Sequence, residues 1–160
     1  MNDPETLQAK AARVLGGGET ILAAGIFGLQ TNYAAVTVGG VVGSSLLGGG
    51  VAGGALGNAA GMHAGRELDA ESKGVTVRML VAVTATHIHV LDWVTGSGPT
   101  RELRSFDRST TCVEVKKFGL SRRLHLQDKA SGEALALTGS ASALSAEAKG
   151  DKGVFKALAA

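Results

Sequence analysis

A ladder of glycines spaced four residues apart, inside a long uncharged stretch, constrains this chain more than any other feature. Between Thr20 and Met62 there is no Asp, Glu, Lys or Arg. The ladder consists of Gly49, Gly53, Gly57, Gly61 and Gly65. Positions four apart share one face of an α-helix, so the spacing predicts a smooth groove into which another backbone packs. Each glycine costs a helix about 0.5–1 kcal/mol relative to alanine, so such a helix needs a packing partner.

The ladder predicts an inserted hairpin of two small-residue helices, Ala34–Leu47 and Val51–Leu68, joined by Gly48–Gly50. Three accounts of its glycine face stay open. The helices pack within one chain, they pack between chains in an oligomer, or they enter a bilayer, where small residues promote helix association. A β-domain with a charged outer face covers such a surface poorly, which favours the last two accounts.

Membrane insertion of this segment is borderline. A spanning helix needs about 20 predominantly apolar residues, whereas the strong apolar residues here are divided between two short segments rich in glycine. The start of the chain, MNDPETLQAK, has no apolar core typical of a signal peptide. The single cysteine, Cys112, excludes an intramolecular disulfide and favours a reducing compartment. We expect a cytoplasmic protein, with peripheral attachment to the membrane left open.

Outside the insert, the pattern predicts an α+β fold. Asp3-Pro4-Glu5 is typical of a helix start, and that helix should end near Leu15, before three glycines. Alternating, β-branched segments predict strands at Val75–Thr84, His87–Val94, Arg101–Phe106, Cys112–Phe118, Arg122–Gln127 and Glu133–Thr138. Glu19–Gly28 resembles a further strand, with a helix left open as the alternative. A C-terminal helix is expected at Gly153–Ala159. Regular turn spacing favours an antiparallel barrel or sandwich, closed at one end by that helix.

Four segments follow from these predictions. Residues 1–18 form an N-terminal helix and glycine linker, and 19–33 hold the first strand of the β-domain. Residues 34–74 form the glycine hairpin insert, and 75–160 complete the β-domain with its C-terminal helix.

The runs LVAVTATHIHVLDW, RELRSFDRSTTCVEV, GLSRRLHLQD and GEALALTG resemble bacterial pleckstrin-homology-like domains of the GRAM type. The resemblance covers residues 75–158 and 19–28, and it follows strands and turns rather than a catalytic signature. This chain departs from the family pattern by placing the glycine-rich hairpin between the first two strands. That hairpin is itself similar to glycine-zipper segments, which tend to be membrane-associated or self-packing. The resemblance implies a binding or scaffold module for lipid headgroups or proteins, and it transfers no site residues.

A basic cluster flanks one tight turn. Lys116, Lys117, Arg122 and Arg123 surround the sequence FGLS, so their charges should converge at one end of a hairpin. Such a tip suits an anionic lipid surface at about 1 kcal/mol per basic residue. It is more typical of a solvated edge that resists pairing with other chains. Phe118 and Leu120 at the same turn either anchor in an interface or fold back over the sheet.

Catalytic and metal-binding interpretations are weaker. His87 and His89 lie two apart on a predicted strand and should face the same side, but a metal would need a third ligand from elsewhere. Cys112 is expected to be a buried thiol, and the carboxylates Glu102 and Glu114 should be solvated. We therefore expect no metal, no cofactor and no enzymatic activity.

The net charge of +2 gives no support for a nucleic-acid partner. The sequence favours a non-enzymatic module that is peripheral to the membrane or self-associating, with anionic lipid, a second copy or another protein as partner. The glycine hairpin supplies hydrophobic association, and the basic tip contacts anionic lipid. The alternative is a soluble assembly protein whose hairpins pack chain to chain.

Overall fold

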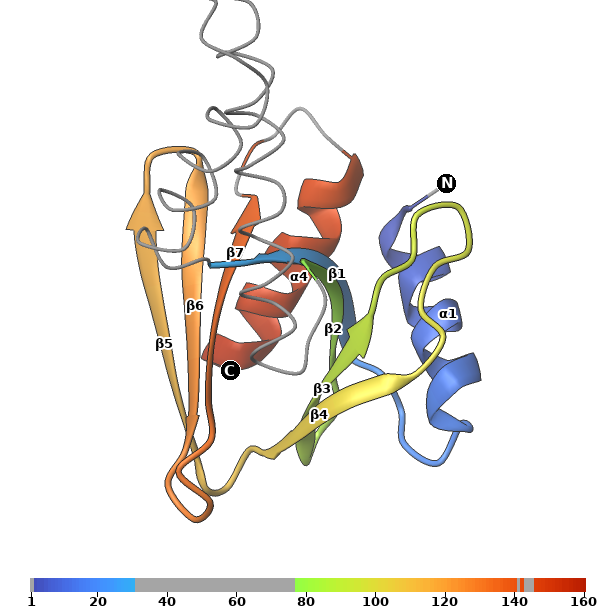
Figure 1. Cartoon of the computed structure of the whole chain (residues 1–160). Coiled ribbons are helices and arrows are strands. Elements are labelled where there is room, and N and C mark those ends of the chain that lie inside the picture. Colours follow the sequence, from blue (N-terminus) through green and yellow to red (C-terminus); the bar gives the residue numbers. More distant parts are fainter. Residues whose placement is uncertain (1, 31–76, 141, 143–145) are drawn as a thin grey trace, which may run out of the picture. The chain divides into compact units, whose positions relative to one another are not determined.

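A computed structural model of this chain describes residues 2–30, 77–140, 142 and 146–160 (Figure 1). The predicted hairpin insert, with all five glycines of the ladder, lies outside these residues. The described residues form a β-domain and two helices.

The N-terminal helix α1 spans Pro4–Leu15, as the sequence predicts. Asp3 caps it, because its carboxylate accepts a hydrogen bond of 2.8 Å from the Thr6 N–H. Gly16 ends the helix with a left-handed φ of 76°, and its N–H bonds the carbonyl of Ala12. Leu7 is fully buried and packs against the central strands. Helix α1 is therefore fixed at both ends by local sequence and held along its length by core contacts.

Seven antiparallel strands form one open sheet in the described residues, in the order β4-β3-β2-β1-β7-β6-β5. Their bounds are β1 Ala23–Leu29, β2 Arg78–Val83, β3 His87–Asp92, β4 Glu102–Asp107, β5 Thr111–Phe118, β6 Ser121–Asp128 and β7 Ala134–Ser140. The α+β class and the strand succession are confirmed. Of the two predicted arrangements, barrel and sandwich, the barrel is wrong for the described residues, because β4 and β5 remain as the two edges of the sheet, whereas a sandwich is compatible with this order.

Strand β1 joins the two halves of this sheet. It pairs with β2 from Ala23 to Gly28, although residues 30–77 separate the two strands in sequence. It pairs with β7 at Gly28 and Leu29, at its far end. The earlier part of β1 is therefore available to another element on that side.

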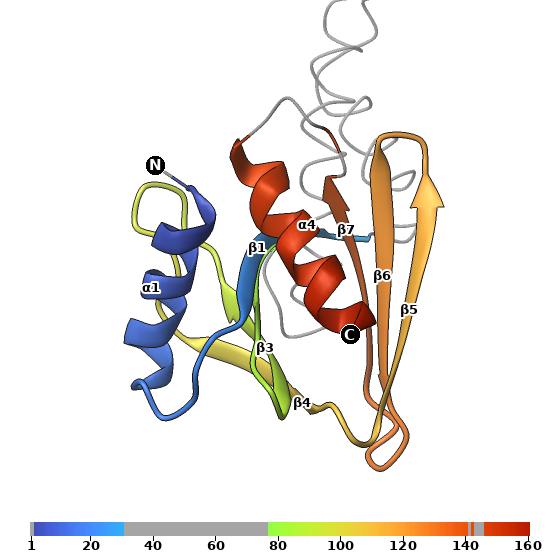
Figure 2. The same ribbon diagram turned by 180° about the vertical axis from the view of Figure 1, so that it is seen from behind.

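The C-terminal helix α4, Ala146–Ala159, packs against that part of β1 (Figure 2). The approach is close because glycine lies on both sides of the contact. A Cβ atom on Gly150 would lie 2.7 Å from the carbonyl oxygen of Ala24, and one on Gly25 would lie 2.8 Å from the backbone N of Asp151. The helix is longer than the predicted Gly153–Ala159. The prediction missed its first turns because they lie in a segment rich in alanine and interrupted by glycine.

Asp151 is buried inside this contact, with 2% of its surface exposed. Its Oδ2 accepts a hydrogen bond of 2.7 Å from the Ser140 N–H at the end of β7. Desolvation raises the pKa of Asp151 to about 7, opposed by hydrogen bonds from the backbone of Ser140 and Ile26. The helix, β1 and the end of β7 thus meet around one carboxyl group.

Two glycines of α4 should respond oppositely to the same substitution. Gly150→Ala should lower the free energy of unfolding by about 1–3 kcal/mol, because the new methyl overlaps the β1 backbone. Gly153→Ala meets its nearest atom, the Cβ of Ala23, at 3.6 Å, and should raise stability by about 0.5–1 kcal/mol through helix propensity. Urea denaturation measures both. Equal effects of the two variants would contradict the close contact at Gly150.

Stability should also depend on pH through Asp151. Its pKa is about 7 in the folded chain and about 3.9 in an unfolded one, so the folded state binds more protons between these values. The free energy of unfolding should therefore fall as pH rises from 4 to 7. Between pH 5 and pH 8 the wild type should lose roughly 2–3 kcal/mol relative to Asp151→Asn, which does not ionise. Parallel urea midpoints for the two proteins across this range would contradict the assignment.

Candidate functional site

The β5–β6 hairpin ends in a tip, Lys116–Arg123, that holds the four predicted basic residues. Lys116 pairs directly with Arg123 and Lys117 with Arg122. Gly119 takes a φ of 58° in the turn between them, a left-handed value that glycine adopts without strain. The structure therefore brings these four side chains to one end of the hairpin.

The four cations are divided between the two faces of the hairpin. Directly paired residues share a face, and successive residues alternate. Lys116 and Arg123 lie on one face with Phe118, whose ring lies 4.3 Å from the Arg123 guanidinium carbon. On the other face, the Arg122 guanidinium carbon lies 5.5 Å from the ring of Phe155 in α4. One pair is thus turned outward, while Arg122 of the other pair contacts the helix.

Two like-charged pairs opposite each other destabilise an antiparallel ladder. Glu114 approaches Lys116 at 3.3 Å, but both side chains are exposed, so this ion pair adds little. The tip therefore carries an excess of positive charge that an anionic partner would offset.

Phe118 and Leu120 are the most exposed large hydrophobic residues of the described chain, at 62% and 77% of their surface. They do not fold back over the sheet, so that one of the two predicted alternatives is wrong. The tip consequently combines cations with an unburied apolar pair at the end of a two-stranded ribbon.

A second cluster lies at the start of β3. His87 and His89 share a face of this strand, as predicted, and their rings stack with centroids 5.6 Å apart. Glu19, in the loop between α1 and β1, reaches them, with its Oε1 3.3 Å from His87 Nδ1. The sequence placed Glu19 at the start of a strand, but β1 begins at Ala23. Nothing in the local pattern signals a contact across 68 positions.

The remaining predicted candidates take structural or solvated positions. Cys112 is exposed on β5, so its predicted burial is wrong: β5 is an edge strand, and this residue faces away from the core. Glu102 and Glu114 are exposed, as expected. Trp93 is half-buried against the α1 core, with Lys10 Nζ 5.3 Å from its ring centroid.

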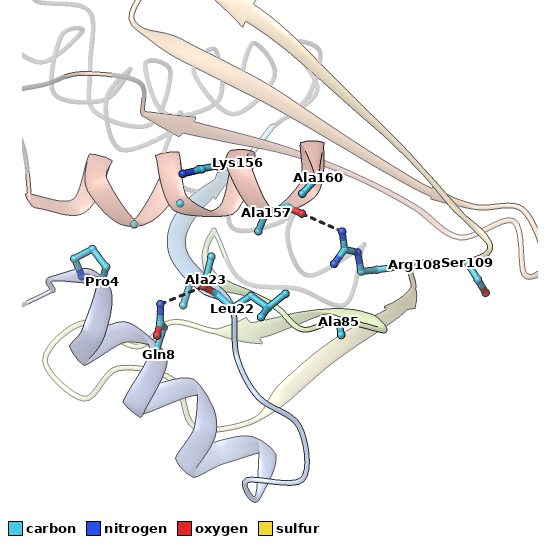
Figure 3. A pocket seen from close by; sticks show the side chains of 13 residues that line it. Pro4, Gln8, Leu22, Ala23, Ala85, Arg108, Ser109, Lys156, Ala157 and Ala160 are labelled. Carbon is cyan, nitrogen blue, oxygen red and sulfur yellow. Dashed lines mark hydrogen bonds between the residues drawn. The ribbon is translucent and has the colours of Figure 1, made fainter.

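A groove of about 850 Å³ runs between α1, β1 and α4 (Figure 3). Small residues form much of its wall, among them Ala23, Gly150 and Gly153. The guanidinium of Arg108 lies at one end and donates to the carbonyls of Thr84 and Ala157, at 2.9 and 3.0 Å. Arg108 therefore ties the end of α4 to the β2–β3 turn, and the groove follows from helix packing.

A scan against protein-family models gave no match, and a search of curated proteins found no relative. Within the described residues, neither helix has the length and hydrophobicity needed to cross a bilayer. The geometry of the sites therefore carries the functional argument.

Proposed function

We propose that this chain is a non-enzymatic module that docks peripherally on an anionic membrane surface through the β5–β6 tip. The observation that carries the proposal is the exposure of Phe118 and Leu120 beside four cations. Exposed apolar groups next to basic side chains match the chemistry of an interface where headgroups are anionic and acyl chains begin.

The fold is compatible with a pleckstrin-homology-like domain. Three strands on each side of β1, with a C-terminal helix packed against β1, are compatible with the sandwich that the sequence resemblance implies. The sheet leaves the β5–β6 ribbon at its edge, so the tip is accessible without rearrangement of the core.

The energetics favour reversible binding that needs both components of the tip. Each basic residue near an anionic surface contributes about 1 kcal/mol. Full burial of a Phe or Leu side chain contributes roughly 1.5–3 kcal/mol. Either contribution alone gives weak attachment, whereas their sum supports stable peripheral binding.

We further propose that the glycine insert, residues 34–74, strengthens attachment through hydrophobic association. Its ladder suits close packing of helices in an apolar medium. The same chemistry would serve an assembly protein in which inserts of several chains pack together, which is the alternative function.

Liposome flotation tests the tip. The protein should float with vesicles of phosphatidylcholine and phosphatidylserine and much less with phosphatidylcholine alone. Phe118→Ser/Leu120→Ser should weaken binding at least about tenfold, and Lys116→Gln/Arg123→Gln about 30-fold, since two cations near the surface are removed.

Matched controls separate the tip from general surface properties. Leu22→Ser/Val94→Ser removes two exposed apolar residues elsewhere, and Lys152→Gln/Lys156→Gln removes two exposed cations of α4. Both should bind like the wild type. Flotation that ignores acidic lipid, or that changes equally in the control variants, would remove the tip from the proposal.

The insert is tested by Gly53→Leu/Gly57→Leu, which fills the ladder with bulky side chains. We expect the variant to keep its molar mass in detergent-free buffer while its liposome binding falls. Sedimentation velocity and flotation measure the two quantities. A fall in molar mass instead would support the assembly alternative.

A further inference from the structure

The loop between α1 and β1 places a carboxylate beside two histidines of β3, on other strands than the β5–β6 tip. Glu19 Oε1 lies 3.3 Å from His87 Nδ1, and Glu19 Oε2 lies 4.0 Å from His89 Nε2. One ligand atom from each of the three residues can be chosen so that all lie within 4.8 Å of one another. Two imidazoles and a carboxylate therefore converge on one small volume.

The neighbouring strand orients one of these imidazoles. Glu102 on β4 approaches His89 Nδ1 through its Oε1 at 2.7 Å. A proton on Nδ1 that donates to this carboxylate leaves the lone pair of Nε2 directed toward Glu19. A carboxylate that holds the outer nitrogen of a histidine is the usual support of a metal-binding imidazole, because it fixes the tautomer and the ring.

The carboxylate of Glu19 is also held in place. The Thr86 hydroxyl oxygen lies 3.1 and 3.0 Å from the two oxygens of Glu19 and 2.8 Å from His87 Nδ1. Hydrogen bonding from the Thr84 and Thr86 hydroxyls lowers the pKa of Glu19. The Thr86 hydroxyl thus holds the Glu19 carboxylate beside the His87 imidazole.

We propose that Glu19, His87 and His89 bind a divalent transition-metal ion of the zinc class, with Glu102 supporting His89 from outside the ligand shell. Imidazole nitrogen with carboxylate oxygen is a ligand set that zinc accepts, at bond lengths near 2.0–2.2 Å. Three protein ligands leave a coordination position for water or an external ligand. Hard cations such as Mg²⁺ prefer oxygen ligands and should not compete.

The cluster can close on an ion by small side-chain rotations. Tetrahedral zinc places its ligand atoms about 3.3 Å apart, so pairs of ligand atoms that now lie up to 4.8 Å apart must approach by up to about 1.5 Å. The side chains of Glu19 and His87 are 43% and 37% exposed, so an ion can reach them from solvent and take the place of the Thr86 hydrogen bonds. The bound ion would join the α1–β1 loop to β3.

Isothermal titration of the full chain with Zn²⁺ tests the site, together with visible absorption on adding Co²⁺. Both are done in a His63→Ala background, so that this histidine of the insert does not contribute. We expect one Zn²⁺ per chain, tetrahedral Co²⁺ bands, a higher melting temperature with Zn²⁺, and no response to Mg²⁺. His89→Ala and Glu19→Gln should abolish the Co²⁺ bands, and Glu102→Gln should weaken binding about 10–100-fold.

His125→Ala is the matched control. His125 lies on β6 opposite Glu114, so it too is a histidine beside a carboxylate, but among the residues that the structure describes it belongs to no such cluster. This variant should bind Zn²⁺ like its parent. Failure of the parent to bind Zn²⁺, or undiminished binding by His89→Ala with an unchanged far-UV circular dichroism spectrum, would overturn the proposal and leave a hydrogen-bonded network that holds the loop.

Discussion

The close contact between α4 and β1 is the constraint on which the rest of this structure depends. Strand β1 belongs to both halves of the sheet, but β7 meets it only at its far end, where Gly28 and Leu29 pair. The helix covers the rest, and it does so at backbone distance because Gly25 and Gly150 carry no side chain. The end of β1 that pairs with β7 leads on to β6 and β5, which complete this side of the sheet.

Asp151 makes the same contact polar at its centre. A carboxyl group that is 2% exposed is costly when ionised, and its raised pKa expresses that cost. In return, its Oδ2 accepts the hydrogen bond of the Ser140 N–H, at the point where β7 ends. Unpaired backbone N–H groups in a buried place cost about as much as a lost hydrogen bond. The acid therefore holds the end of one strand and the first half of one helix in register.

Local signals explain what the sequence could predict, and long-range contacts explain what it could not. Asp3 and Gly16 fix α1 because caps act within a few residues, and the tight turn after Phe118 sets the hairpin register, so the tip was predictable. Turn spacing predicts antiparallel strands, but it does not distinguish an open sheet from a closed barrel. The barrel alternative was wrong for this reason. The contact of Glu19 with His87 depends on how the α1–β1 loop lies beside β3, which local sequence does not encode. The exposure of Phe118 and Leu120 depends on the absence of a covering element in the described residues.

The tip and the histidine cluster differ in how they balance their own charge. At the tip, Lys116 faces Arg123 and Lys117 faces Arg122, and two exposed apolar side chains extend beyond them. The like-charged pairs destabilise the ladder, and the exposed apolar side chains are typical of an interaction site. Around His89, each ring nitrogen already has a carboxylate as its neighbour, Glu102 at Nδ1 and Glu19 at Nε2. The first arrangement gains most from a large anionic and apolar surface outside the chain. The second is satisfied within the fold, and a small ion could enter it by replacing hydrogen bonds with coordinate bonds.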